Sequence, residues 1–120
     1  MSGRRTIAEF REQRCAGQER VLAVDHLGVK RFFNLDTSAY RDGALPAGTK
    51  ELLGLVASMV LRCNDCIDYH LEQCVLTHGY SEEELVDAMN VALIVGGSIV
   101  IPHLRHAMLS LDELMAERGK

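Results

Sequence analysis

The residues best suited to chemistry lie in one short segment, CNDCIDYH, at positions 63–70. Two cysteines three positions apart on the first turn of a helix, here Cys63 and Cys66, can close a disulfide with little backbone movement. The N–H groups at a helix N-terminus carry partial positive charge, so they stabilise a thiolate relative to a thiol. Since only the thiolate attacks a disulfide or a peroxide, the spacing indicates a redox-active thiol pair.

A histidine completes this segment. His70 follows Cys66 by four residues, which places the two side chains one turn apart on the same face of a helix. A neutral imidazole can take the thiol proton, directly or through a water, and then return it to a leaving group. His70 is therefore the candidate general base for Cys66.

A zinc site is the sharper alternative for the same residues. The two cysteines, His70 and Cys74 together supply three sulfurs and one nitrogen, which is chemically a full tetrahedral set. On a continuing helix, however, Cys74 would lie about 12 Å along the axis from Cys66. One ion with bonds of about 2.3 Å does not easily reach the whole set. We therefore expect no metal and a buried, apolar role for Cys74.

The elements that must position these residues are all predicted to be helices. Thr6 with Glu9, and Ser81 with Glu84, each fit a capping box, and nothing in the chain alternates as a strand would. We predict an all-α fold, a helical bundle of about six helices in one domain spanning residues 1–120. The predicted helices cover residues 7–17, 19–34, 49–62, 65–78, 81–95 and 102–118, with a short helical turn at Tyr40, a loop at 42–48 and a left-handed Gly79.

The break between the helices 49–62 and 65–78 decides whether Glu51 belongs to the site. Asn64 and Asp65 favour caps and turns over helix interiors. On one continuous helix Glu51 would lie about 28 Å from His70, whereas a chain reversal near residue 63 reduces the axial gap to roughly 8 Å. Glu51 can then orient His70. The alternative is a first-turn glutamate favoured by the helix dipole.

These residues resemble the alkylhydroperoxidase D-like branch of the carboxymuconolactone decarboxylase family. The redox motif of that family is a Glu, about a dozen residues, C-x-x-C, and a His four residues after the second Cys. Glu51, Cys63, Cys66 and His70 occupy these positions. The resemblance covers most of residues 40–116. It implies an all-helical fold, homo-oligomers that are often trimers or hexamers, and thiol-dependent hydroperoxide reduction or disulfide exchange.

The resemblance also implies roles for the four residues. His70, held by Glu51, draws the proton from Cys66, whose thiolate attacks a small-molecule hydroperoxide. Cys63 then closes the disulfide, which an external dithiol or protein disulfide reductant opens. The order of attack stays open, because Cys63 lies nearer the helix start and Cys66 nearer the base. Some family members carry a second His before the second Cys. Here that residue is Asp65, whose negative charge disfavours the Cys66 thiolate.

Two other functions remain as alternatives. A decarboxylase acting on a lactone acid, as the family name implies, would need a general acid and carboxylate-binding cations rather than paired thiols. A non-catalytic, zinc-stabilised helical module would use the cysteines as ligands. We expect no cofactor for the thiol chemistry. Cys15 looks incidental, and His103 and His106 are expected at the surface or at a subunit interface.

Composition limits the partners. The net charge of −4, from 13 Lys and Arg against 17 Asp and Glu, removes the electrostatic reason to expect nucleic acid or an anionic membrane. The longest apolar stretch, 91–101, is far shorter than the ~20 residues that span a bilayer. No signal peptide is visible, so we expect a cytoplasmic protein. Since the stretch 91–101 is apolar nearly all round, it is the best candidate for a subunit interface in a homo-oligomer.

Overall fold

The computed structural model describes residues 4–120, and within that range every regular element is helical, as predicted. A π-helical turn continues the fourth helix, and a short 3₁₀ turn precedes the last. The elements are α1 (Ile7–Leu22), α2 (Leu27–Ala39), α3 (Ala47–Val60), α4 (Asn64–Glu72), η1 (Gln73–Thr77), α5 (Glu82–Gly96), η2 (Ser98–Val100) and α6 (Ile101–Arg118).

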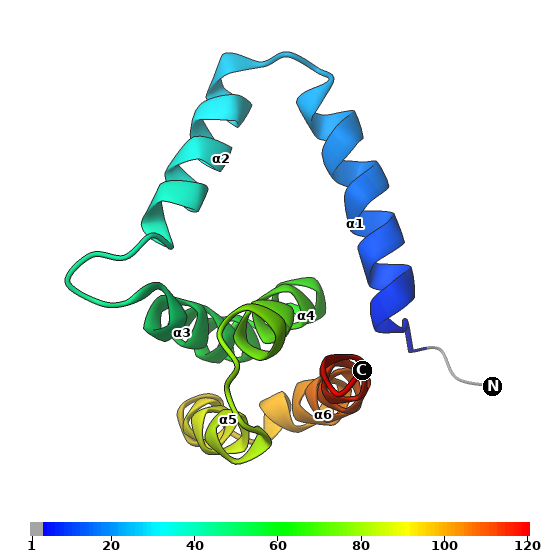
Figure 1. Ribbon diagram of the computed structural model, residues 1–120, viewed down its shortest axis with the longest axis vertical. Helices are drawn as coiled ribbons and strands as arrows, with labels where there is room; N and C mark the ends of the chain where they lie inside the picture. The colour runs from blue at the N-terminus through cyan, green and yellow to red at the C-terminus, as the bar shows by residue number, and fades with distance from the viewer. Residues whose placement is uncertain (1–3) are drawn as a thin grey trace.

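Helices α3 to α6 form a bundle. Helices α1 and α2 form an inverted V above it, with the turn that joins them at the end away from the bundle (Figure 1). The core of the bundle is aliphatic, because the sequence holds no Trp and few other aromatic residues. Its largest fully buried side chains include Leu55, Met59, Ile67, Leu71, Leu85, Met89, Leu111 and Leu114. Helix α1 buries only its first turns, and α2 buries no residue. The buried core therefore lies in the bundle, and α1 and α2 are supported by it.

The capping boxes at Thr6 and Ser81 form as predicted, and Gly79 takes a left-handed φ of +67°. The predicted break after residue 17 is wrong, because α1 continues to Leu22 and the chain turns over residues 23–26 instead. Asp25 makes that turn with a φ of +57°, a conformation that Asp tolerates better than most residues. The segment at 19–34 is thus divided between two helices, and α2 runs on to the residue before Tyr40.

Helix α3 begins two residues earlier than predicted, with Pro46 rather than Thr49 as its N-cap. The reason is Asp42, whose Oδ1 accepts the N–H of Ala47 at 2.7 Å and so supplies the missing cap from the preceding loop. At the other end, Arg62 adopts a φ of +60°. This turn directs the chain into α4 with Cys63 as N-cap, which is the reversal predicted from Asn64 and Asp65.

No helix in the described range is long and apolar enough to cross a membrane. The stretch 91–101 lies at the end of α5, and several of its apolar side chains stay exposed to solvent. They include Val91, Ile94, Val95 and Ile99.

Candidate functional site

Helices α3 and α4 bring Glu51 and His70 into direct contact. Both side chains are buried, and His70 Nδ1 lies 2.7 Å from Glu51 Oε1. The ring's other nitrogen, Nε2, lies 3.5 Å from the hydroxyl of Tyr40, at the end of α2. The Glu51 carboxylate and the Tyr40 hydroxyl thus contact opposite nitrogens of the ring. The arrangement presents Nε2 on the side of His70 away from Glu51.

Gly54 makes room for the His70 ring. A Cβ placed on this α3 residue would lie 2.7 Å from His70 Cε1 and 2.9 Å from both ring nitrogens. Only a residue without a side chain therefore allows the imidazole to lie flat against α3. Gly54 was not singled out in the sequence, where a glycine inside an apolar helix has no distinguishing pattern.

The two cysteines of the C-x-x-C motif lie at the N-terminus of α4 as free thiols. The backbone N–H of Cys66 donates to Cys63 Sγ over 3.3 Å, so the helix terminus supports the Cys63 sulfur. Partial burial raises the pKa of the Cys66 thiol to about 11, and its hydrogen bond with Cys63 and the negative charges of Cys63 and Asp65 add to the rise. The surroundings of Cys66 therefore disfavour its thiolate.

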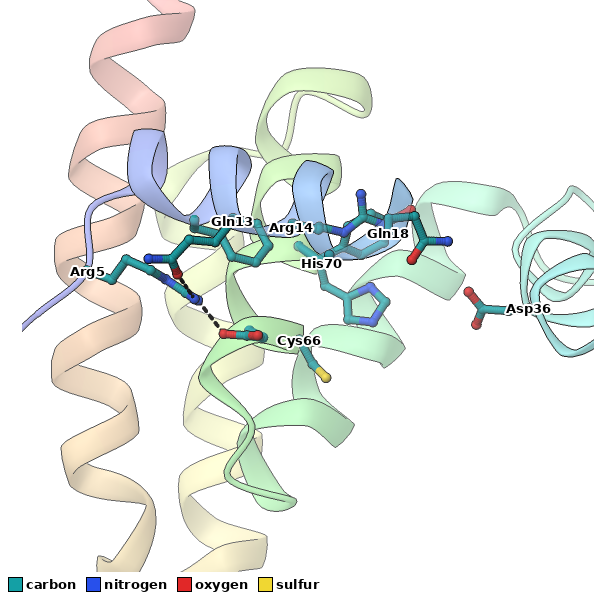
Figure 2. A pocket seen from close by; sticks show the side chains of 11 residues that line it. Arg5, Gln13, Arg14, Gln18, Asp36, Cys66 and His70 are labelled. Atoms are coloured by element: carbon teal, nitrogen blue, oxygen red, sulfur yellow. Dashed lines mark hydrogen bonds and ion pairs between the residues drawn. The ribbon is translucent and has the colours of Figure 1, made fainter. Parts of the chain in front are cut away.

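A pocket of about 520 Å³ joins Cys66 and His70. One wall is α1 from Phe10 to Gln18, the floor is α4, and α2 contributes Asp36 from the far side, as Figure 2 shows. The guanidinium of Arg14 lies over the Tyr69 ring, 4.5 Å from its centroid. The lining residues are Arg5, Phe10, Gln13, Arg14, Gly17, Gln18, Asp36, Asp65, Cys66, Tyr69 and His70.

The fourth residue of the alternative zinc set lies elsewhere. Cys74 is fully buried in η1, and burial raises the pKa of its thiol to about 12. Over residues 4–120, no three His, Cys, Asp or Glu side chains are grouped as a metal ion would require. Cys74 is a core residue, as expected, and Cys15 is exposed on α1.

The two histidines of α6, which we expected at the surface or at a subunit interface, both contact α4, and the His106 side chain is only 10% exposed. His106 Nε2 lies 2.9 Å from Oδ1 of the fully buried Asp68, and Ser110 donates to the same oxygen over 2.7 Å. His103 Nδ1 lies 2.8 Å from Asn64 Oδ1. Both histidines thus fasten α6 to the first turns of α4, a role that their spacing in the sequence does not reveal.

Arg5 and Arg14, which line the pocket, and Tyr40 beside His70 have contacts with the site that their positions in the sequence do not indicate. Arg5 ion-pairs with Asp65, sixty positions away, Arg14 stacks on Tyr69, and Tyr40 lies against His70 with ring centroids 5.4 Å apart. No local spacing links these residues to the C-x-x-C motif, so only the packing of α1 and α2 on α4 could identify them.

The sequence matches a known protein family. The sequence model of the Carboxymuconolactone decarboxylase family matches residues 28–110. An uncharacterized protein of Cupriavidus necator is 30% identical over 88 residues, which are 73% of this chain and 77% of that protein. An uncharacterized protein of the cox locus of Paracoccus denitrificans is 29% identical over 83 residues, 69% of this chain and 74% of that one.

Solved structures show the same fold. A crystal structure from Thermotoga maritima superposes with a TM-score of 0.84 at 55% identity, covering 92% of this chain and 94% of that one. It is described as a carboxymuconolactone decarboxylase family protein with a suggested part in the antioxidative response. A family protein from Legionella pneumophila, in its apo form, has a TM-score of 0.82 at 22% identity, over 90% of this chain and 96% of that one.

Proposed function

The chain belongs to the carboxymuconolactone decarboxylase family, and on that premise we propose that it is a thiol-dependent hydroperoxide reductase with Cys63 and Cys66 as its redox-active pair. The observation that carries this proposal is the Glu51–His70 hydrogen bond of 2.7 Å, on a His70 that lines the same pocket as Cys66. A histidine oriented by a carboxylate next to a thiol is the arrangement that activates a sulfur nucleophile. The family relative with a suggested antioxidative part is consistent with this chemistry.

In the first step His70 acts as the general base. Its Nε2 accepts the proton of Cys66, directly or through a water, while Glu51 stabilises the imidazolium that forms. The thiolate attacks the distal oxygen of the hydroperoxide, the O–O bond breaks, and the imidazolium returns the proton to the departing alkoxide. The products are an alcohol and a sulfenic acid on Cys66.

In the second step Cys63 resolves the sulfenic acid. The Cys63 thiolate attacks the Cys66 sulfur, an S–S bond forms, and the hydroxyl leaves as water together with the proton from Cys63. Two electrons have then passed from the thiol pair to the peroxide. An external dithiol or protein disulfide reductant, with a matching pair of thiols, returns the site to its reduced state by exchange.

We assign the attack on peroxide to Cys66 because it lines the pocket with His70, whereas Cys63 does not line it. Cys63 is instead the N-cap of α4, where its sulfur accepts a hydrogen bond from the backbone N–H of Cys66. A resolving thiol needs to form a thiolate near its partner sulfur, not to reach the substrate. This division of roles predicts that Cys66→Ser abolishes turnover, while Cys63→Ser stops after one turnover with a trappable sulfenic acid.

Peptide mass mapping after one equivalent of an organic hydroperoxide tests the proposal directly. In reduced, metal-free protein we expect the loss of two hydrogens confined to a Cys63–Cys66 peptide. Slow oxidation scattered over all four cysteines would contradict the peroxidase assignment. The decarboxylase alternative is tested in parallel, because its activity on a lactone acid would survive alkylation of Cys63 and Cys66 whereas peroxide reduction would not.

We further propose that the chain works as a homo-oligomer in the cytoplasm, as a trimer or a hexamer. Exposed apolar side chains at the end of α5 and along α2 support self-association, since Ile94 is 77% exposed and Leu35 is 71% exposed. Sedimentation velocity should give a mass of three or six chains. An Ile94→Glu variant should sediment as smaller species, and a wild-type protein that stays monomeric at micromolar concentration would contradict the assembly.

A further inference from the structure

Arg5, in the segment just before α1, connects the acidic residues that flank Cys66 in the sequence. Its Nη2 donates to Asp65 Oδ1 and lies 3.9 Å from Oδ2 of Asp68. The buried Asp68 Oδ2 accepts no hydrogen bond in the described part of the chain, and the Arg5 guanidinium faces this oxygen, while His106 contacts the other carboxylate oxygen.

Two further contacts fix the position of this guanidinium. Arg5 Nη1 donates to Gln13 Oε1 over 2.8 Å, and the guanidinium carbon lies over the Phe10 ring, 4.9 Å from its centroid. The side chain is only 24% exposed. Figure 2 shows Arg5 and Gln13 at the end of the pocket next to Cys66, with Arg14 and Asp36 farther along. The contacts from α1 hold the charge beside α4, where it also forms part of the pocket wall.

We propose that Arg5 is a positioning residue for the thiol chemistry: it holds and neutralises the Asp65 carboxylate, so that the thiol of Cys66 can ionise although an acidic residue precedes it. This inference rests on one part of the proposed function, namely that Cys66 is the reactive thiol. Asp65 is one of the charges that oppose ionisation of Cys66. A cation bonded to that carboxylate offsets its field, because the two charges act on the sulfur with opposite signs.

The other charged groups around Cys66 do not duplicate this effect. On α4, Cys63 also opposes ionisation of Cys66. His70 and Asp36 line the same pocket, and Glu51 on α3 is bonded to His70. From α1, Arg14 is positive but lies over Tyr69 rather than against Asp65. Arg5 is thus the cation of the pocket that contacts the carboxylate next to Cys66.

The test compares the rate at which limiting iodoacetamide labels Cys66 in reduced protein, from pH 7 to pH 10, with the label located by tandem mass spectrometry. We expect Arg5→Gln to slow labelling at pH 8 by about threefold and Asp65→Asn to accelerate it by about threefold, since the pair is partly exposed and its field is screened. The double variant R5Q/D65N should return close to the wild-type rate. Arg5→Lys should stay within about twofold of wild type, because it keeps the charge.

Arg11→Gln is the matched control. Arg11 also lies on α1 and ion-pairs with Glu72 and Glu117, but it does not line the Cys66 pocket. Its loss should leave the labelling of Cys66 unchanged. Circular dichroism and the thermal midpoint of each variant show whether it is folded.

The double variant separates charge from packing. It lacks the Arg5 contacts with Gln13 and Phe10, so recovery of the rate in R5Q/D65N can come only from the restored charge balance. A double variant as slow as Arg5→Gln, or an Arg5→Gln variant with wild-type labelling, would overturn the inference. No step of this test uses a peroxide, so a chain without peroxidase activity would disprove the proposed function and leave this result standing.

Discussion

Two histidine–carboxylate pairs join α4 to its neighbours, one to α3 and one to α6, and they differ in what surrounds them. Glu51 on α3 holds His70 at 2.7 Å, and Asp68 on α4 holds His106 of α6 at 2.9 Å. The histidine side chains are equally enclosed, each 10% exposed. By distance and burial alone the two pairs would be given the same role.

The difference lies in which nitrogen is engaged and what is next to it. His70 uses Nδ1 for its carboxylate, and its Nε2 lies 3.5 Å from the Tyr40 hydroxyl, in a pocket that is also lined by Cys66. His106 uses Nε2, and Asp68 Oδ1 accepts from Ser110 as well. The cavity beside His106 contains no cysteine. The surroundings therefore distinguish the two pairs: only His70 shares a pocket with a thiol, which is why we propose it as the base, whereas His106 joins α6 to α4.

The largest expected effect is that of pH on the reactivity of Cys66, the thiol beside the first pair. The pKa of Cys66 is raised to about 11, so its thiolate fraction should rise about tenfold per pH unit between pH 8 and that value. The rate of Cys66 alkylation by iodoacetamide should therefore rise roughly a thousandfold over this range. The exposed Cys15, labelled in the same sample, serves as an internal control for the activity of the reagent. A plateau of Cys66 labelling already at neutral pH would show that no base is needed.

Removing the base should have the next largest effect. His70→Ala deletes the acceptor for the Cys66 proton, and we expect the rate of peroxide-driven disulfide formation to fall about a hundredfold. His106→Ala is the matched control, because it removes the same side chain from the other pair. Stopped-flow kinetics with mass mapping measures both. Equal losses in the two variants would show that burial of a histidine, rather than its pocket, determines the rate.

Gly54→Ala should disturb the first pair more mildly. The added methyl group would approach His70 Cε1 to 2.7 Å, so the ring must shift away from Glu51. We expect oxidation about tenfold slower, from misplacement of the base, although Ala favours a helix over Gly by about 1 kcal/mol. Gly17→Ala is the control, since a Cβ there meets nothing within 4 Å. A G54A enzyme of wild-type rate would contradict the steric role.

Disrupting the Asp68–His106 pair should have the smallest effect on the rate of Cys66 oxidation. His106→Ala leaves the buried Asp68 with one hydrogen bond fewer, which should lower the free energy of unfolding by about 2 kcal/mol. The rate of Cys66 oxidation should stay within about twofold of wild type. Urea denaturation gives the first value and the peroxide assay the second. Unchanged stability together with slower oxidation would reverse the assignment of the two pairs.

The part of the site that follows from local rules could be predicted from the sequence. Asn64 and Asp65 predicted the chain reversal, and the reversal brings Glu51 to His70. The capping boxes at Thr6 and Ser81 likewise place helix starts correctly, because both partners of each box lie within one turn.

The rest depends on contacts between distant parts of the chain. Arg5 reaches Asp65 over sixty positions, and the space at Gly54 is needed only because His70 occupies it. The turn at Asp25 was missed for a different reason. It has neither Gly nor Pro, and its positive φ is a conformation that non-glycine residues adopt infrequently.

Helix α2 has a consequence for how the site opens. Since it buries no side chain in the bundle, its hydrogen bonds can break without disturbing the core, and its amide hydrogens should exchange with solvent far faster than those of α3. Yet α2 leads to Tyr40 and contributes Asp36 to the pocket. We therefore expect local opening of α2 to expose the pocket at His70. Hydrogen exchange in α2 that slows at higher protein concentration would indicate that neighbouring subunits restrict this opening.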